Sequence, residues 1–167
     1  GGSREFGALK IGMLFTKLPA QLALRGYLVI ASQYSGNAGS EGRDEMCGRD
    51  IEDVLVLKKI LKKYRRANPS RIGMFGESRG GIMTYLSLAK VKWIKAAVTI
   101  GGVTNLIRGE KLRPEMKDHY KKMFGGSMEE KKKRSAIFWT HLFPKKTPLL
   151  IMHGGSDWRV SPLDSID

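Results

Sequence analysis

The sequence predicts an α/β protein with a doubly wound, mostly parallel β-sheet. The first observation is a set of short apolar segments that are nearly continuous, as expected for strands covered on both faces. The second is that amphipathic helical patterns lie between these segments. Strands and helices that alternate in this way are typical of βαβ units, whose strands run parallel.

Four apolar segments are expected to form strands. They are Tyr27 to Ser32, Ile72 to Phe75, Ala96 to Ile100, and Leu149 to Met152. Helices are expected over about Ala8 to Leu24, Asp50 to Tyr64, and Gly80 to Lys90. Pro19 should kink or divide the first helix. The second helix opens with acidic residues and closes with basic ones, which suits the helix dipole.

The stretch from Val103 to Lys146 interrupts this alternation, because it is longer than a standard crossover connection. Its pattern predicts helices near 115–123 and 129–141, separated by the pair Gly125-Gly126. We interpret residues 103–146 as a cap-like insertion over one end of the sheet. The alternative is a surface excursion without a role at the site. No repeat or linker divides the sequence, so residues 1–167 are treated as one domain.

Composition excludes several classes of protein. The net charge of +14 would suit an anionic partner, but the basic residues near 58–66 alternate with apolar ones at helical spacing, which is typical of a solvated helix face. Zinc-finger spacing and ribonucleoprotein motifs are missing, so nucleic acid is not expected as a partner. No apolar run approaches the ~20 residues of a membrane span. Cys47, the single cysteine, cannot form an internal disulfide and is expected to be a small buried side chain.

The run Gly76-Glu77-Ser78-Arg79-Gly80 connects a predicted strand to a predicted helix. A tight turn of this kind needs small residues around a strained serine, and it lifts the hydroxyl above the carboxyl end of the sheet. The backbone N–H of Arg79, at the helix N-terminus, could then bind a developing oxyanion. We therefore interpret Ser78 as the nucleophile of an α/β-hydrolase. A purely structural turn is the alternative.

A second motif, from His153 to Val160, follows the last predicted strand. In α/β-hydrolases the catalytic acid follows the nucleophile in chain order, on a later strand. Asp157 is therefore expected to be the acid that orients the catalytic histidine, with an ordinary turn as the alternative. Asp164 and Asp167 are weaker candidates, because no strand directly precedes them.

These motifs stand among further segments that match one family in the same order. The segments are Gly1 to Gly7, Tyr27 to Ala31, Tyr34 to Asp44, Asp50 to Asp53, Gly76 to Gly81, and His153 to Pro162. Together they resemble the catalytic domain of the prolyl oligopeptidase family, whose fold is the α/β-hydrolase fold. The resemblance implies hydrolysis of peptide or ester bonds through an acyl-enzyme. It implies no cofactor or metal, and an additional N-terminal domain in the parent protein.

The resemblance also carries roles to particular residues. Ser78 corresponds to the nucleophile and Asp157 to the acid. Gly2 lies in the loop that supplies the second oxyanion-hole N–H in relatives with a Gly-Gly pair, beside the N–H of Arg79. Some relatives use a tyrosine hydroxyl just before that pair, and a flexible chain end is the non-functional interpretation of Gly2.

The family order places the catalytic histidine after the acid, but His119, His141 and His153 all precede Asp157. We expect His153 to shape the loop that presents Asp157. The chain is therefore interpreted as an internal fragment of a hydrolase domain, with its catalytic histidine outside the sequence and little activity of its own. The function predicted first is cleavage of short peptides. A carboxylesterase and a non-catalytic binding protein are the alternatives. The sequence assigns no compartment.

Overall fold

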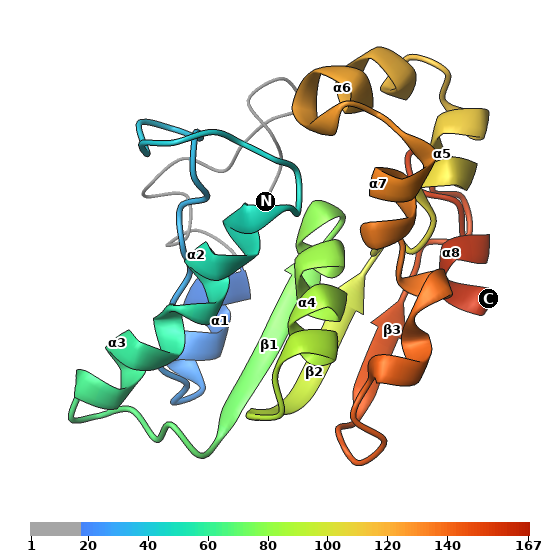
Figure 1. Cartoon of the computed structure of the whole chain (residues 1–167). Helices are drawn as coiled ribbons and strands as arrows, with labels where there is room; N and C mark the ends of the chain where they lie inside the picture. The colour runs from blue at the N-terminus through green and yellow to red at the C-terminus, as the bar shows by residue number, and fades with distance from the viewer. Residues whose placement is uncertain (1–17) are drawn as a thin grey trace.

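The structure, a computed structural model, describes residues 18–167. Helices and strands alternate along the chain, and Figure 1 shows their arrangement. In chain order they are α1 (Leu18–Leu24), α2 (Glu52–Leu55), α3 (Leu57–Lys63), β1 (Ile72–Glu77), α4 (Arg79–Lys90), β2 (Ile94–Ile100), α5 (Leu106–Leu112), α6 (Met116–Phe124), α7 (Met128–Lys133), β3 (Leu149–Met152) and α8 (Leu163–Ile166). Short 3-10 turns occur at Arg49–Ile51, Ala136–Phe138 and Thr140–Leu142.

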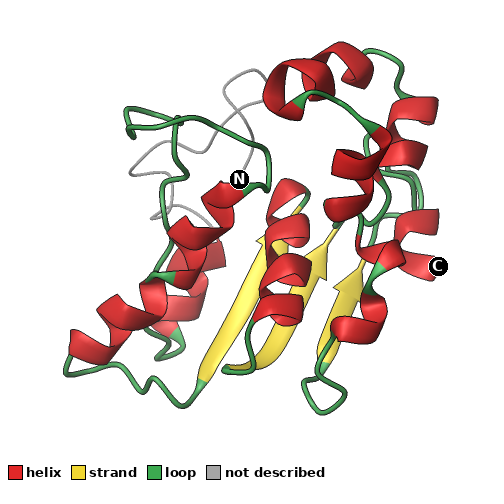
Figure 2. Cartoon of the chain, viewed as in Figure 1, coloured by secondary structure: helices red, strands yellow, loops and turns green. Residues whose placement is uncertain are grey.

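The three described strands form one parallel sheet in the order β1-β2-β3, and their arrows point the same way in Figure 2. The three predicted strands after residue 70 are confirmed, with β1 and β2 each extended by two residues. The helix predicted over Gly80 to Lys90 is confirmed as α4. The helix predicted over Asp50 to Tyr64 appears as a 3-10 turn followed by α2 and α3. Of the first predicted helix, only α1 falls within the described residues.

The prediction of a strand from Tyr27 to Ser32 is wrong. This segment is neither helix nor strand, and Tyr27 is 65% exposed. Ile30, Ala31 and Ser32 line a cavity together with residues of β1, but they form no ladder with it. An apolar run signals a tendency to be buried, whereas a strand also needs a neighbour that pairs with its backbone. The sequence pattern contains no information about that neighbour.

The register of the sheet separates its two faces. Met74, Ala97 and Leu149 lie in one row and pack in the same apolar cluster as Leu88 of α4. The next row is Phe75, Val98 and Leu150, whose side chains point to the opposite face because neighbours along a strand alternate. In this second row Phe75 is 40% and Leu150 is 55% exposed. Helix α4 therefore covers one face, and the other face presents apolar side chains to solvent.

The insertion lies over the carboxyl ends of the strands, where α5, α6 and α7 gather above the arrowheads in Figure 1. Helix α5 was not predicted. Asn105 initiates it, because its side chain accepts hydrogen bonds from the N–H groups of Ile107 and Arg108. Helix α6 ends at Gly125, which has a left-handed backbone. The helix predicted over 129–141 is shorter than expected, since α7 ends at Lys133 and two 3-10 turns follow.

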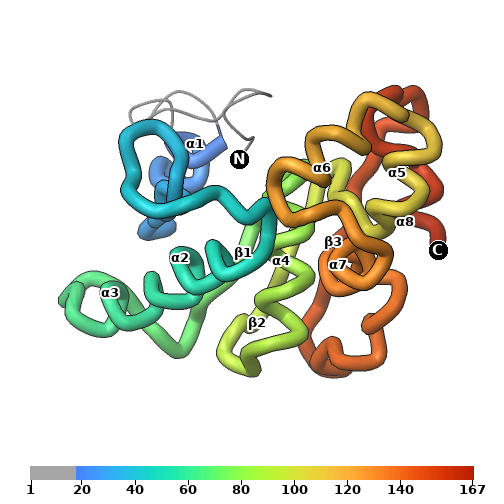
Figure 3. Tube along the Cα trace, turned by 45° about the horizontal axis from the view of Figure 1, so that its top comes forward, coloured from blue at the N-terminus to red at the C-terminus, as the bar shows by residue number. Residues whose placement is uncertain are grey.

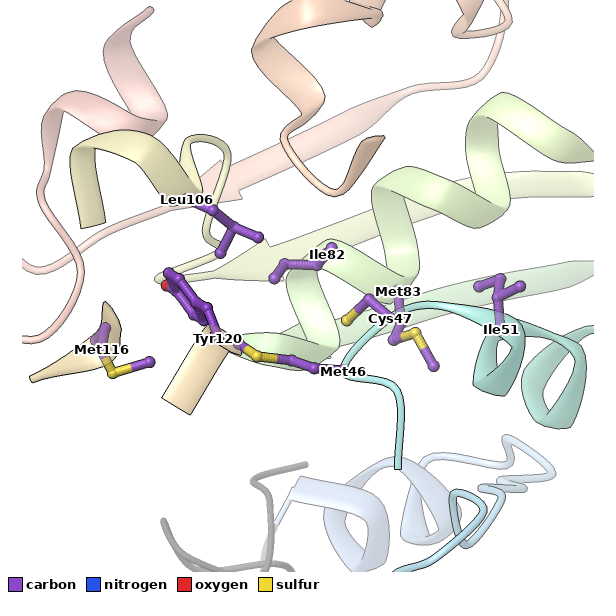
Figure 4. Close-up of a cluster of buried hydrophobic side chains, with 8 residues drawn as sticks. All are labelled: Met46, Cys47, Ile51, Ile82, Met83, Leu106, Met116 and Tyr120. Carbon is purple, nitrogen blue, oxygen red and sulfur yellow. The ribbon is translucent and has the colours of Figure 1, made fainter. Parts of the chain in front are cut away.

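One apolar cluster joins the insertion to α4 and to the loop before α2 (Figure 4). Its buried members are Met46, Cys47, Ile51, Ile82, Met83, Leu106, Met116 and Tyr120. Figure 3 shows α2 and α3 on one side of α4, and α5, α6 and α8 on the other. The cluster therefore connects both sides through the helix that begins directly after Ser78.

Candidate active site

Ser78 occupies the turn between β1 and α4, with φ 53° and ψ −117°. A positive φ is rare for a residue with a side chain and costs on the order of 1–3 kcal/mol. The turn is held on both sides: Ser78 N–H donates to Ile100 O at 3.0 Å, and Gly81 N–H donates to Ser78 O at 2.9 Å. The side chain of Ser78 is exposed. A strained strand-to-helix turn of this kind presents the nucleophile in α/β-hydrolases.

Two glycines around Ser78 are required by close approach of the backbone. A Cβ at Gly76 would overlap the carbonyl group of Gly80 and the hydroxyl of Thr84. A Cβ at Gly81 would lie 2.5 Å from Gly102 Cα, two residues beyond the end of β2. Neither contact leaves room for a methyl group, so the turn depends on these glycines.

Arg79 is the first residue of α4, where backbone N–H groups have no partner within the helix. Its side chain is buried, unlike that of Ser78. The guanidinium binds both carboxylate oxygens of Asp44, at 2.7 and 2.6 Å, and also pairs with Asp50. It lies 5.0 Å from the centre of the Tyr34 ring. The side chain therefore anchors the start of α4 to the loop that precedes α2.

The charge network around Arg79 changes how Asp44 titrates. Burial alone would raise the pKa of Asp44. The hydrogen bonds and charge of Arg79, with hydrogen bonds from Asn37 and Met46 N–H, outweigh burial and lower this pKa below its ordinary value of 3.8. Sequence reasoning missed this network. The available signal was a pair of acids, Asp44 and Asp50, in the segments that match the family, but nothing in their spacing pointed to Arg79.

Asp157 follows β3 and lies at the same edge of the sheet as Ser78. Its Oδ1 accepts hydrogen bonds from the N–H groups of Arg159 and Val160, at 2.8 and 3.0 Å. Its Oδ2 would be 3.3 Å from a Cβ on Gly101. Gly101 directly follows Ile100, which accepts the Ser78 N–H. One short stretch of backbone therefore separates the two side chains, and one oxygen of Asp157 has no backbone donor among the described residues.

The three histidines differ in their burial and contacts. His153 is nearly buried, with Nδ1 at 2.6 Å from Ser165 Oγ and Nε2 at 3.0 Å from Val160 O. Its Nε2 is also 3.6 Å from Asp157 Oδ2. His119 is buried in α6 of the insertion, and His141 is exposed. None of the three lines the cavity that contains Ser78.

That cavity has a volume of about 110 Å³, and its lining combines apolar residues with the charged residues Arg79, Arg159 and Asp164. Met46 and Ile82 line it from the loop and α4, while the insertion supplies further residues, most of them apolar and one of them charged. The contributors from the insertion are Val103, Gly109, Arg113, Met116 and Tyr120. Arg113 and Arg159 also lie against the ring of Trp158, at 5.8 and 5.3 Å from its centre. The cavity could take an apolar side chain from a substrate held at Ser78.

Asp164, a weaker candidate of the sequence, also lines this cavity, whereas Asp167 does not. Asp164 is buried and accepts hydrogen bonds from the N–H groups of Thr104 and Asn105, at 2.9 and 3.2 Å. It also pairs with Arg108, as does Asp167. These two acids therefore hold the start of the insertion. Gly2 lies outside the described residues.

No group of His, Cys, Asp and Glu side chains within residues 18–167 is arranged to hold a metal ion. In the same part of the chain, no helix is long and apolar enough to cross a membrane.

Comparison with known proteins agrees with this geometry. The model of the prolyl oligopeptidase family matches residues 15–167. The uncharacterized peptidase YtmA of Bacillus subtilis (strain 168) is 31% identical over 166 residues, which are 96% of this chain and 62% of YtmA. YitV of the same organism, which carries the name of an esterase, is 29% identical over 155 residues, covering 81% of this chain and 60% of YitV. The chain thus spans about three fifths of the length of these relatives.

Among solved structures, the acylaminoacyl peptidase of Pyrococcus horikoshii superposes with a TM-score of 0.64 at 24% identity. The match covers 74% of this chain and 21% of that one. At 24% sequence identity, this similarity supports an assignment of the fold alone. Together with the parallel sheet and the turn at Ser78, it identifies a partial α/β-hydrolase fold.

Proposed function

Because the chain belongs to the prolyl oligopeptidase family, we propose that it is the nucleophile-bearing part of a serine peptidase that cleaves short peptides through an acyl-enzyme. The observation that carries the proposal is the position of Ser78. Its exposed hydroxyl stands on a strained turn, at a helix N-terminus, and at the sheet edge that also holds Asp157. This arrangement suits nucleophilic attack on a carbonyl carbon.

In the proposed mechanism Ser78 Oγ attacks the carbonyl carbon, and the carbonyl oxygen gains negative charge. The Arg79 N–H would donate to this oxygen, with Gly2 as the second donor that the family resemblance suggests. The base takes the proton of the Ser78 hydroxyl during attack and gives it to the leaving amine, so that collapse of the tetrahedral intermediate expels a neutral amine and leaves an ester on Ser78. Water then hydrolyses that ester.

We assign Asp157 the role of orienting the catalytic base. Its Oδ1 is bound by two backbone N–H groups, which leaves Oδ2 to accept a hydrogen bond from an imidazole. His153 is a poor candidate for the base, because both of its ring nitrogens are already bound by Ser165 and Val160. We therefore propose that the base is a histidine beyond residue 167, and that this chain alone is inactive.

Residues 103–146 are proposed to act as a cap. Their side chains line the cavity beside Ser78 together with residues of α4, so they would contact a bound substrate. The apolar residues of the lining, among them Met46, Ile82 and Val103, support an apolar substrate side chain next to the bond that is cleaved. A further N-terminal domain in the whole protein is also proposed, since solved relatives are several times longer than this chain.

Ester hydrolysis is the second candidate, favoured by the similarity to YitV. The turn at Ser78 serves either reaction, because amides and esters pass through the same kind of tetrahedral intermediate. The two can be separated with a polypeptide that extends past both ends of this sequence. Turnover of p-nitrophenyl esters without turnover of aminoacyl-naphthylamides would favour the esterase.

A fluorophosphonate probe tests the core of the proposal on the same extended polypeptide. We expect covalent labelling of Ser78 and its loss in Ser78→Ala. Asp157→Asn should slow labelling strongly, because the base would lose its orientation. Labelling that survives Ser78→Ala would refute the nucleophile. Absence of any histidine after the next strand of the longer sequence would instead favour a non-catalytic binding protein.

A further inference from the structure

We infer that the side chain of Arg79, held by Asp44 and Asp50, is a positioning device for the oxyanion donor, and that Arg134 of the insertion braces it. The inference rests on the proposed function, in which the backbone N–H of Arg79 binds the oxyanion. It adds a role for the side chain of Arg79, which belongs to the motif around Ser78. It also adds a role for three side chains outside the catalytic motifs, those of Asp44, Asp50 and Arg134. None of the four is proposed to touch the substrate's reacting atoms through its side chain.

The need for such a device arises from the backbone at Ser78. The positive φ of this residue stores strain at the position directly before the donor N–H. A donor must lie within a few tenths of an ångström of its place to stabilise an oxyanion well, and a displacement of about 1 Å can cost about 100-fold in rate. Something rigid must therefore hold Arg79 against relaxation of the turn.

The carboxylates of Asp44 and Asp50 meet this need. Asp44 binds the guanidinium of Arg79 through both oxygens, so the side chain is fixed in direction as well as in position. Asp50 binds the same guanidinium, and its side chain is fully buried. One carboxylate would be enough to balance the charge of Arg79. The second therefore points to a role in fixing the position of the guanidinium.

The same two acids also hold their own loop. Met46 N–H donates to Asp44 Oδ1 at 2.9 Å, and Cys47 N–H donates to Asp50 Oδ2 at 3.1 Å. Met46 and Cys47 have φ values of 46° and 68°, which side-chain-bearing residues rarely adopt. The acids thus join a strained loop to the strained turn at Ser78 through the single side chain of Arg79.

Arg134, which follows α7 in the insertion, binds this loop through hydrogen bonds to its backbone. Its Nε donates to Met46 O at 2.9 Å and its Nη2 donates to Glu45 O at 3.2 Å. The guanidinium lies 4.3 Å from the centre of the Phe124 ring and is almost fully buried. A continuous set of contacts therefore runs from the insertion, through residues 44–50, to the donor beside Ser78.

The alternative is that these ion pairs only stabilise the fold. A buried pair with one partner removed destabilises a protein whatever its role, so loss of activity alone would not decide. The decisive readout is binding of an oxyanion mimic. A peptide boronate forms a tetrahedral adduct with the serine, and its affinity depends on the oxyanion donors in the way that kcat does.

The experiment uses the active extended polypeptide with three variants: Asp44→Asn, Arg79→Lys and Arg134→Gln. We expect kcat and boronate affinity to fall together, by about 10- to 100-fold for the first two and less for the third, with KM nearly unchanged. Asp53→Asn is the matched control, because Asp53 binds the N–H and hydroxyl of Ser35 without touching Arg79. It should leave kcat and boronate affinity as in the wild type.

Near-UV circular dichroism and the midpoint of thermal unfolding identify variants that do not fold. Only the variants that fold are then compared with the wild type. Wild-type kcat in the folded variants would overturn the inference while the proposed function stands. So would a rise in KM with unchanged kcat, or an equal loss in Asp53→Asn. Failure of the wild type to form any adduct at Ser78 would instead refute the proposed function itself, and the inference with it.

Discussion

Ser78 and the glycines around it define the site at the scale of single residues. The turn combines a positive φ at Ser78 with contacts that exclude a methyl group at Gly76 and Gly81. The hydroxyl is exposed, although Arg79 beside it is buried. Strain of this kind persists only where surrounding structure enforces it, and here the enforcing contacts come from β2 and from α4.

Gly76→Ala tests this requirement. The new methyl group would overlap backbone at Gly80, which cannot move without distorting the first turn of α4. We expect the free energy of unfolding to fall by at least about 2 kcal/mol in urea denaturation. Gly154→Ala is the matched control, since its Cβ would have no heavy atom within 4 Å, and a change under about 0.5 kcal/mol is expected. Equal stabilities of the two variants would contradict the packing argument.

Cys47 provides a second prediction for a single residue. Burial raises the pKa of its thiol to about 12, so almost no reactive thiolate exists near neutral pH. We expect the folded chain to react with Ellman's reagent at pH 8 only at the rate of unfolding, and to react fully in denaturant. Because Cys47 is the single cysteine, the signal needs no correction for other thiols. Rapid reaction of the folded chain would show that the loop opens.

At the scale of elements, the loop of residues 44–50 connects the two halves of the described chain. It is joined to α4 by Arg79 and to the insertion by Arg134. Apolar side chains of the same loop, Met46 and Cys47, belong to the cluster shared with α4, α5 and α6. The loop therefore depends on contacts with residues far away in the sequence for its conformation.

Acid should weaken this connection. The folded pKa of Asp44 is below its ordinary value of 3.8, so the unfolded chain takes up this proton first as the pH falls. The contribution of Asp44 is thus complete above its unfolded pKa and is lost as the pH falls through its folded pKa. We expect the free energy of unfolding to drop below about pH 5, with a smaller slope in Asp44→Asn.

Urea titrations at a series of pH values measure these slopes. Part of the slope should survive in Asp44→Asn. The pKa values of Glu45 and Glu130 are also lowered, mainly by hydrogen bonds from Arg49 and from Lys133 respectively. Identical slopes in the two proteins would mean that Asp44 is not coupled to folding as its contacts indicate.

At the scale of the whole molecule, the described helices leave one face of the sheet partly exposed. The row of Phe75, Val98 and Leu150 lies opposite the face that packs on α4. Met152, two residues beyond Leu150 on the same face, is 47% exposed. Adjacent exposed apolar side chains of this kind favour association, because burying them against a second surface removes them from water.

We therefore expect this chain to self-associate in a concentration-dependent manner in sedimentation velocity. Leu150→Gln should shift the distribution toward monomer. Leu142→Gln is the matched control, because Leu142 is 54% exposed, nearly the same as Leu150, but lies in a 3-10 turn away from the sheet face. If both variants behave alike, or if the parent chain is monomeric throughout, the open face does not drive association.

Much of the local structure could be predicted because it is determined by short stretches of sequence. The strands β1, β2 and β3 and the helix α4 follow from apolar runs and helical spacing. One missed element, α5, is a seven-residue helix whose start depends on the cap at Asn105 and on tertiary contacts of Asp164. The segment 27–32 has the composition of a strand but no partner among the described strands. Composition alone therefore predicted a strand that does not form.

The features of the candidate site also fall into two groups, those predicted from the sequence and those seen only in the structure. The sequence by itself determined the family, the turn that presents Ser78, and Asp157 at the end of a later strand, because each is encoded in consecutive residues. Only the tertiary structure decided that Asp44 and Asp50 meet at Arg79, that Arg134 grips the loop between them, and which face of the sheet is open. The contacts of Arg79 and Arg134 join residues 29 to 89 positions apart, and no local pattern encodes which distant residues will meet.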